Sequence, residues 1–183
     1  MTQSITPPVA PGMVVFFCGK MGAGKSTLAR HIAAHLGAVL LSEDQWLNAL
    51  YPDEIQGLED YIRCSRRLKS VLFPHVSTLL ARGQHVVLDF PGNTFAQRSW
   101  FKQIVDESGS PHTLIHLIKT DEVCLGQIAL RRLQEPERAA TDTLEMFNAV
   151  NSHFVAPTDD EGLNVMNCTH WHDDMFSALG AKP

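Results

Sequence analysis

Short apolar runs alternate along the chain with longer segments in which apolar residues recur every three or four positions. The first run, MVVFFC at 13–18, is continuous and rich in residues that favour strands. It therefore predicts a strand buried on both faces, as in a parallel sheet. Four more strands are expected from similar short runs, at 38–41, 84–90, 113–118 and 163–167.

The segments between these runs have helical spacing. Within 25–36, Leu28, Ile32 and Leu36 fall on one side, and Gly37 is placed to end the helix. A short helix is expected before Pro52. The remaining helices are expected at about 58–82, 94–107, 121–132 and 142–154.

Three polar or cyclic residues predict where helices are interrupted or begin. Pro74 lacks an amide hydrogen, so it predicts a kink in the helix at 58–82 or the start of a new one. Asp121 is expected to cap the helix that follows it. Asp142, with Glu145 three positions later, resembles a capping box.

Strands that alternate with helices predict an α/β fold with a mostly parallel sheet and right-handed crossovers. Such sheets bind ligands at the carboxyl ends of their strands. Polar or glycine-rich segments follow three of the predicted strands, at 19–26, 42–44 and 89–92. All three segments are therefore expected at one edge of the sheet.

Length and composition indicate an ordinary globular protein. The 183 residues, 44% hydrophobic and 19% charged, fit a single domain at 13–183 after a flexible, proline-containing leader at 1–12. The net charge of −5 argues against general nucleic-acid binding. The apolar runs are too short to span a membrane, and four scattered cysteines favour a reducing cytoplasm over a disulfide framework.

The segment GKMGAGKS at 19–26 fits the Walker A pattern GxxxxGK[ST]. Its glycines let successive backbone N–H groups point at phosphate oxygens, and the next helix adds its positive N-terminal end. Lys25 is placed to reach the β- and γ-phosphates of ATP, and Ser26 to bind Mg²⁺. The nucleotide-binding residues are expected to be Gly19, Lys20, Met21, Gly22, Ala23, Gly24, Lys25, Ser26 and Thr27.

Two carboxylates at strand ends are candidates for chemistry beside this loop. Asp44 could take the proton of an attacking hydroxyl, help hold Mg²⁺, or only cap the short helix. Its neighbour Glu43 is a second, weaker candidate for the base. Asp89 ends the run VVLD, which fits a Walker B acid that contacts Mg²⁺ directly or through water, or is otherwise a turn residue.

Basic residues offer further candidates. Arg131 could stabilise charge on the transferring group or only favour a helix C-terminus, and Arg132 and Arg138 are weaker candidates. Arg98 could touch substrate or lie on a solvated helix face. A basic cluster is expected either to face solvent or to receive an anionic substrate; it comprises Arg63, Arg66, Arg67 and Lys69.

Cys168, His170 and His172 have the spacing C-x-H-x-H, which matches no common structural zinc site. No fourth ligand is evident, so no zinc is expected.

Several motifs together resemble the bacterial P-loop kinase-like proteins often labelled AAA family ATPase, which are similar to zeta toxin, chloramphenicol phosphotransferase and the polynucleotide kinase domain. The resemblance spans about 13–165. It rests on GKMGAGKSTLA (19–29), LSEDQWLNALYPDEI (41–55), VVLDFPGNTFAQRSWF (86–101) and the helix that ends at Arg131.

This resemblance implies a three-layer α/β/α P-loop NTPase fold of the nucleotide-kinase type, with strand order 2-3-1-4-5. It implies that Asp44 is the general base, that Lys25 and Ser26 are the Walker A pair, and that Arg131 belongs to a lid near 131–141. The family pattern has a second lid arginine four residues earlier, where this chain has Gln127.

The function expected from these features is a kinase that transfers the γ-phosphoryl group of Mg-ATP to a hydroxyl of a small molecule or to a 5′-hydroxyl. An NTPase or nucleotide-dependent switch without an acceptor is the alternative, and a non-catalytic nucleotide-binding module is a third reading. No motif identifies the acceptor or separates ATP from GTP.

Overall fold

The computed structural model describes residues 9–136, 141–172 and 179. The described chain becomes anchored at Gly12, whose backbone N–H donates to the Leu80 carbonyl at 2.8 Å. The first eight residues of the expected leader and Arg138 of the expected lid lie outside the described residues. Within the described ranges, no helix is both long and apolar enough to cross a membrane.

The centre of the molecule is a five-stranded sheet with order β2-β3-β1-β4-β5, in which every adjacent pair is parallel. The strand order expected from the resemblance is therefore confirmed. Ser42 at the end of β2 pairs with Asp89 in β3, which brings two polar residues to one edge. The strands are β1 Val14–Cys18, β2 Val39–Ser42, β3 Val86–Pro91, β4 His112–Leu117 and β5 Val165–Cys168.

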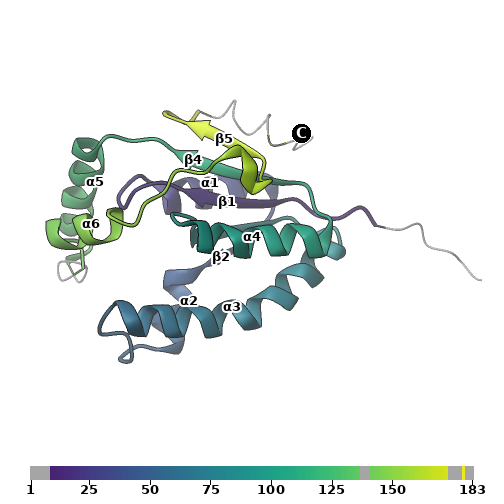
Figure 1. Cartoon of the computed structure of the whole chain (residues 1–183), viewed down its shortest axis with the longest axis horizontal. Coiled ribbons are helices and arrows are strands. Elements are labelled where there is room, and N and C mark those ends of the chain that lie inside the picture. Colours follow the sequence, from purple (N-terminus) through teal and green to yellow (C-terminus); the bar gives the residue numbers. More distant parts are fainter. Residues whose placement is uncertain (1–8, 137–140, 173–178, 180–183) are drawn as a thin grey trace, which may run out of the picture.

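Helices cover both faces of this sheet and complete three layers (Figure 1). One face packs against α3 and α4 in a cluster centred on Phe16, which stacks on Phe101 with ring centroids 4.3 Å apart. The other packs against α1, α5 and α6 around Phe17. The helices are α1 Lys25–Leu36, α2 Glu43–Leu50, α3 Leu58–Ala81, α4 Phe95–Ser108, α5 Asp121–Gln134 and α6 Leu144–Asn151, with a 3₁₀ turn, η2, at Asp159–Glu161.

The helix α3 runs through Pro74 as one element, so no new helix begins there as the sequence had allowed. Proline removes one backbone donor, which weakens the helix locally. Leu72 and Val76 are buried on either side of it in the core, and this packing holds the helix together across the missing bond.

Two predicted helix caps are wrong by one residue. Thr120 caps α5 by accepting from the Val123 N–H at 3.4 Å, and Thr143 caps α6 by accepting from the Met146 N–H at 3.1 Å. Both threonines have extended backbone, as an N-cap requires, whereas Asp121 already lies inside its helix. Asp142 is buried and binds Arg131 instead.

Candidate functional site

The glycine-rich segment forms the turn between β1 and α1, and two of its glycines are required by geometry. Gly22 has φ +77°, and a Cβ there would lie 2.6 Å from the Cys124 carbonyl oxygen of α5. Gly19 has φ +149°, and a Cβ there would lie 2.8 Å from the Leu117 carbonyl oxygen. The loop can therefore pass this close to β4 and α5 only because these side chains are absent.

The Lys25 ammonium lies inside the turn. It donates to the carbonyl oxygens of Gly19 at 2.6 Å and Lys20 at 2.8 Å, which closes the loop on itself. Burial lowers the pKa of Lys25 to about 8. The lysine is thus held at the centre of the loop, where a bound anionic group would stabilise its protonated, charged form.

The loop directs backbone donors toward the space in front of α1. Gly24 has left-handed backbone and caps α1 without a side-chain bond. The first helical N–H groups, of Lys25, Ser26 and Thr27, have no carbonyl one turn earlier within the helix. Together with the helix dipole, such groups form a site for a phosphate.

Two further loop residues, Ala23 and Lys20, are held by protein groups. The Ala23 N–H donates to the Lys20 carbonyl at 3.1 Å, which tightens the turn. The Lys20 ammonium pairs with Asp121 of α5 at 2.5 Å. The Lys20 side chain thus ties the loop to α5.

Asp89 lies directly beside the loop, in the second half of β3. Its Oδ1 accepts from the Ser26 hydroxyl at 3.1 Å, and its Oδ2 lies 3.5 Å from the Ser42 hydroxyl. Burial raises the pKa of Asp89, while the bond from Ser26 acts in the opposite direction. The hydroxyl and carboxylate expected from the two Walker motifs are therefore brought together, and oxygen donors of this kind suit Mg²⁺.

Asp44 and Glu43 are consecutive residues in the first turn of α2, but their surroundings differ. Asp44 is exposed, and its negative charge raises the pKa of both Lys25 and Asp89, although burial is the largest effect on each of those groups. Glu43 points the other way and is 1% exposed. It accepts from Tyr61 at 2.5 Å and from Ser65 at 2.6 Å.

Glu43 is thus a buried anchor of α2 on α3, completed by Lys69 at 3.5 Å. Burial and the neighbouring Glu43 carboxylate raise the pKa of Tyr61, so the phenol stays a donor in this contact. An acceptor with this many partners is poorly placed to take a proton from a substrate. Of the two adjacent carboxylates, only Asp44 is exposed, and its negative charge favours the protonated form of Lys25 in the loop.

The expected lid arginine is held by a carboxylate that sequence reasoning had assigned to a cap. Arg131 donates from Nε and Nη2 to the two oxygens of Asp142, each at 2.6 Å. This bidentate pair joins the end of α5 to the start of α6. Gln127, at the position of the missing second arginine, has its Oε1 3.5 Å from where a Cβ on Gly24 would lie, so its side chain reaches the loop.

Sequence reasoning missed two asparagines that bind the loop. The Oδ1 of Asn93 accepts from the Gly19 N–H, and the Oδ1 of Asn151 accepts from the Met21 N–H, both at 3.0 Å. Asn93 belongs to a turn that follows a predicted strand, so the sequence could have placed it at the same edge of the sheet as the glycine-rich loop. Asn151 ends α6, 130 residues from its partner, and carries no local signal.

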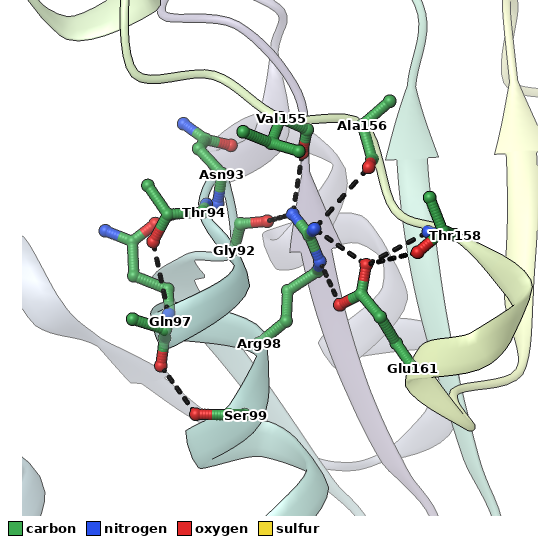
Figure 2. Close-up of polar contacts among 11 residues, drawn as sticks. Gly92, Asn93, Thr94, Gln97, Arg98, Ser99, Val155, Ala156, Thr158 and Glu161 are labelled. Carbon is green, nitrogen blue, oxygen red and sulfur yellow. Dashed lines mark hydrogen bonds and ion pairs between the residues drawn. The ribbon is translucent and has the colours of Figure 1, made fainter.

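Arg98 is buried, so the prediction that it lies on a solvated helix face is wrong, and its guanidinium is bound by protein groups. Its side chain is 1% exposed and pairs with Glu161, which is 4% exposed. Figure 2 shows the guanidinium between the turn at Gly92 and the segment at 155–161. It donates to Glu161 at 2.6 and 2.7 Å, to the Gly92 carbonyl at 3.0 Å and to the Val155 carbonyl at 2.7 Å.

Two members of the basic cluster on α3 bind carboxylates, and the other two are exposed. Arg63 binds Asp60 on the surface, and Lys69 binds Glu43 and lies 5.4 Å from the centre of the Trp100 ring. Arg66 and Arg67 are exposed.

No group of three or more His, Cys, Asp or Glu side chains that could hold a metal occurs in the described part of the chain.

Several solved structures share the fold of this chain. The APS kinase CysC of Mycobacterium tuberculosis, in complex with AMPPNP and APS, aligns with a TM-score of 0.62, 22% identity, and coverage of 94% of this chain and 96% of that one. A gluconokinase from Sinorhizobium meliloti aligns with a TM-score of 0.53 and 13% identity, over 93% of this chain and 90% of that one. Kti12 of Chaetomium thermophilum, in complex with ADP-AlF3, aligns with a TM-score of 0.59 and 16% identity, over 91% of this chain and 94% of that one.

These identities are low, so the likeness shows the fold. No curated protein matches the chain. The sequence pattern of a family described as an AAA domain matches residues 14–157, which include the glycine-rich loop, Asp44, Asp89 and both asparagines. The chain therefore belongs to this AAA domain family and has the fold of P-loop kinases.

Proposed function

We propose that the protein is a kinase that transfers the γ-phosphoryl group of Mg-ATP to a hydroxyl of a small molecule or to a 5′-hydroxyl. The observation that carries this proposal is the position of Asp44. Its exposed carboxylate stands at the same sheet edge as the phosphate loop, and its charge acts on Lys25 and Asp89. A phosphoryl transfer needs a base at this place, whereas nucleotide binding alone does not.

The structural neighbours support the same class of reaction. The APS kinase structure contains AMPPNP and APS, and another neighbour is a gluconokinase. Both are named as kinases, and both align with this chain over 90% or more of their own length, with TM-scores of 0.62 and 0.53. They support phosphoryl transfer as the reaction, without identifying the acceptor in this chain.

Each residue of the site has a separate role in the proposed reaction. The N–H groups at the start of α1 and the Lys25 ammonium would hold the phosphates. Ser26 and Asp89 would hold Mg²⁺, which neutralises charge on the phosphate oxygens. Arg131 would add positive charge over the transferring group, once turned from Asp142.

Asp44 would accept the proton of the acceptor hydroxyl. The freed oxygen would attack the γ-phosphorus, and the bond to the β–γ bridging oxygen would break to leave ADP. Because Glu43 is fixed by Tyr61, Ser65 and Lys69, it would act on this step only by holding α2 in place.

The proposal is tested by ADP release from Mg-ATP with and without a pool of acceptors that contains nucleosides, 5′-hydroxyl oligonucleotides, sugars and hydroxylated antibiotics. A Lys25→Ala variant controls for contaminating activity. Release that rises only with the pool supports the kinase. Release of equal size without any acceptor would contradict it and favour an NTPase or nucleotide-dependent switch.

A further inference from the structure

Asn151 connects the end of α6 to the phosphate loop, and its side chain is only half used. Its Oδ1 accepts from the Met21 N–H at 3.0 Å. The Nδ2 atom of the same carboxamide is buried and has no hydrogen-bond partner among the residues that the structure describes. A buried amide donor without an acceptor is rare in native proteins, where such groups are nearly always satisfied.

The orientation of this carboxamide is fixed by its partner. Met21 N–H is a donor, so it must face the oxygen of Asn151, and a flipped carboxamide would place two donors against each other. Nδ2 and Oδ1 share one carbon, so the unsatisfied donor also lies beside the loop. The group that it lacks is an acceptor.

The helix α6 is firmly attached around this contact. Phe147 is 3% exposed and belongs to the same buried cluster as Ala23 and Ile128. At its other end, α6 follows Asp142, which binds Arg131. Asn151 is therefore held at the loop by a helix that packs into the core, and its donor lies beside Met21.

A loop of this kind gathers backbone donors around anionic phosphate oxygens. We propose that Asn151 is a nucleotide-contacting residue: its Oδ1 holds Met21, and its Nδ2 donates to a phosphate oxygen of the bound nucleotide. This inference rests on the proposed function, because it assumes that a nucleoside phosphate occupies the loop. It adds α6 to the elements that form the site.

Two substitutions separate a phosphate contact from a merely structural bond. Asn151→Asp keeps an oxygen for Met21 N–H but replaces the amide donor with a negative charge. Asn151→Ala removes both. Asn148→Ala is the matched control, because Asn148 is exposed on the same helix.

The measurements are the dissociation constant of Mg-ATP by isothermal titration calorimetry and the exchange of the Met21 amide hydrogen in the nucleotide-free protein. We expect Asn151→Ala to weaken binding about tenfold or more and Asn151→Asp to weaken it further, since a carboxylate repels phosphate. Met21 should exchange slowly in the wild type and Asn151→Asp, and faster in Asn151→Ala. Asn148→Ala should match the wild type in both measurements.

Wild-type affinity in Asn151→Asp would overturn the inference while leaving the proposed kinase intact, because Asn151 would then serve Met21 alone. Absence of Mg-ATP binding by the wild-type protein would overturn both. Thermal unfolding of each variant verifies that it is folded, and Asn151→Ser provides a further small polar replacement if the alanine variant does not fold.

Discussion

The buried pair of Arg98 and Glu161 provides the sharpest prediction about stability. Glu161→Gln keeps the shape of the side chain but removes its charge, which leaves the Arg98 guanidinium 1% exposed with only carbonyl partners and a neutral amide. Removing one member of a buried ion pair typically costs about 3–5 kcal/mol. Because glutamine retains one acceptor oxygen, we expect a loss near the lower limit, about 3 kcal/mol.

Urea unfolding at pH 7, followed by circular dichroism, measures this loss. In thermal unfolding, a loss of about 3 kcal/mol would lower the midpoint temperature of a protein of this size by roughly 6–12 °C. Asp160→Asn, which alters an exposed carboxylate of the same 3₁₀ turn, should change little. If Glu161→Gln were no more destabilising than Asp160→Asn, the pair would not contribute as argued.

The pH dependence of this difference has a definite sign. Burial acts to raise the pKa of Glu161, but its bonds from Arg98 and Thr158 lower it below the ordinary value of 4.5. The stabilisation is therefore complete above about pH 4.5 and is lost as the pH falls through the lower value of the folded state. The gap between wild type and Glu161→Gln should close in acid.

Three further predictions concern the loop and its surroundings. Gly22→Ala should weaken Mg-ATP binding at least tenfold in a calorimetric titration, because its Cβ would lie 2.6 Å from the Cys124 carbonyl oxygen; unchanged affinity would show that the loop adapts. Arg131→Met should lower the unfolding midpoint by several degrees, since the buried Asp142 loses its guanidinium, and an unchanged midpoint would refute this. ATP affinity should fall about tenfold between pH 7 and 9 as Lys25, with a pKa of about 8, loses its charge; a flat titration series would contradict it.

The sequence predicts the elements well where local pattern decides them. The helix Lys25–Leu36 has the predicted bounds, and Gly37 ends it with left-handed backbone as expected. The strand order also agrees with the resemblance. Apolar periodicity and glycine conformations act over a few residues, so they can be read without knowledge of the fold.

What the sequence did not predict depends on contacts between distant segments. Arg98 meets Glu161 across 63 positions, and Asn151 meets Met21 across 130. Nothing in the local pattern separates these polar residues from solvated ones. The cap at Asp142 failed for a related reason: Asp142 had the right spacing for a capping box, but its buried carboxylate binds Arg131 of α5 instead.

The proposed reaction depends on Asp44 as the base of the phosphoryl transfer. Its most direct test compares acceptor-dependent ADP release by wild type and Asp44→Asn, with the affinity for Mg-ATP measured alongside and Asp53→Asn as the exposed control. We expect kcat to fall about 10²–10⁴-fold with ATP affinity maintained, because this is the usual contribution of a general base. Transfer by Asp44→Asn at the wild-type rate would contradict it.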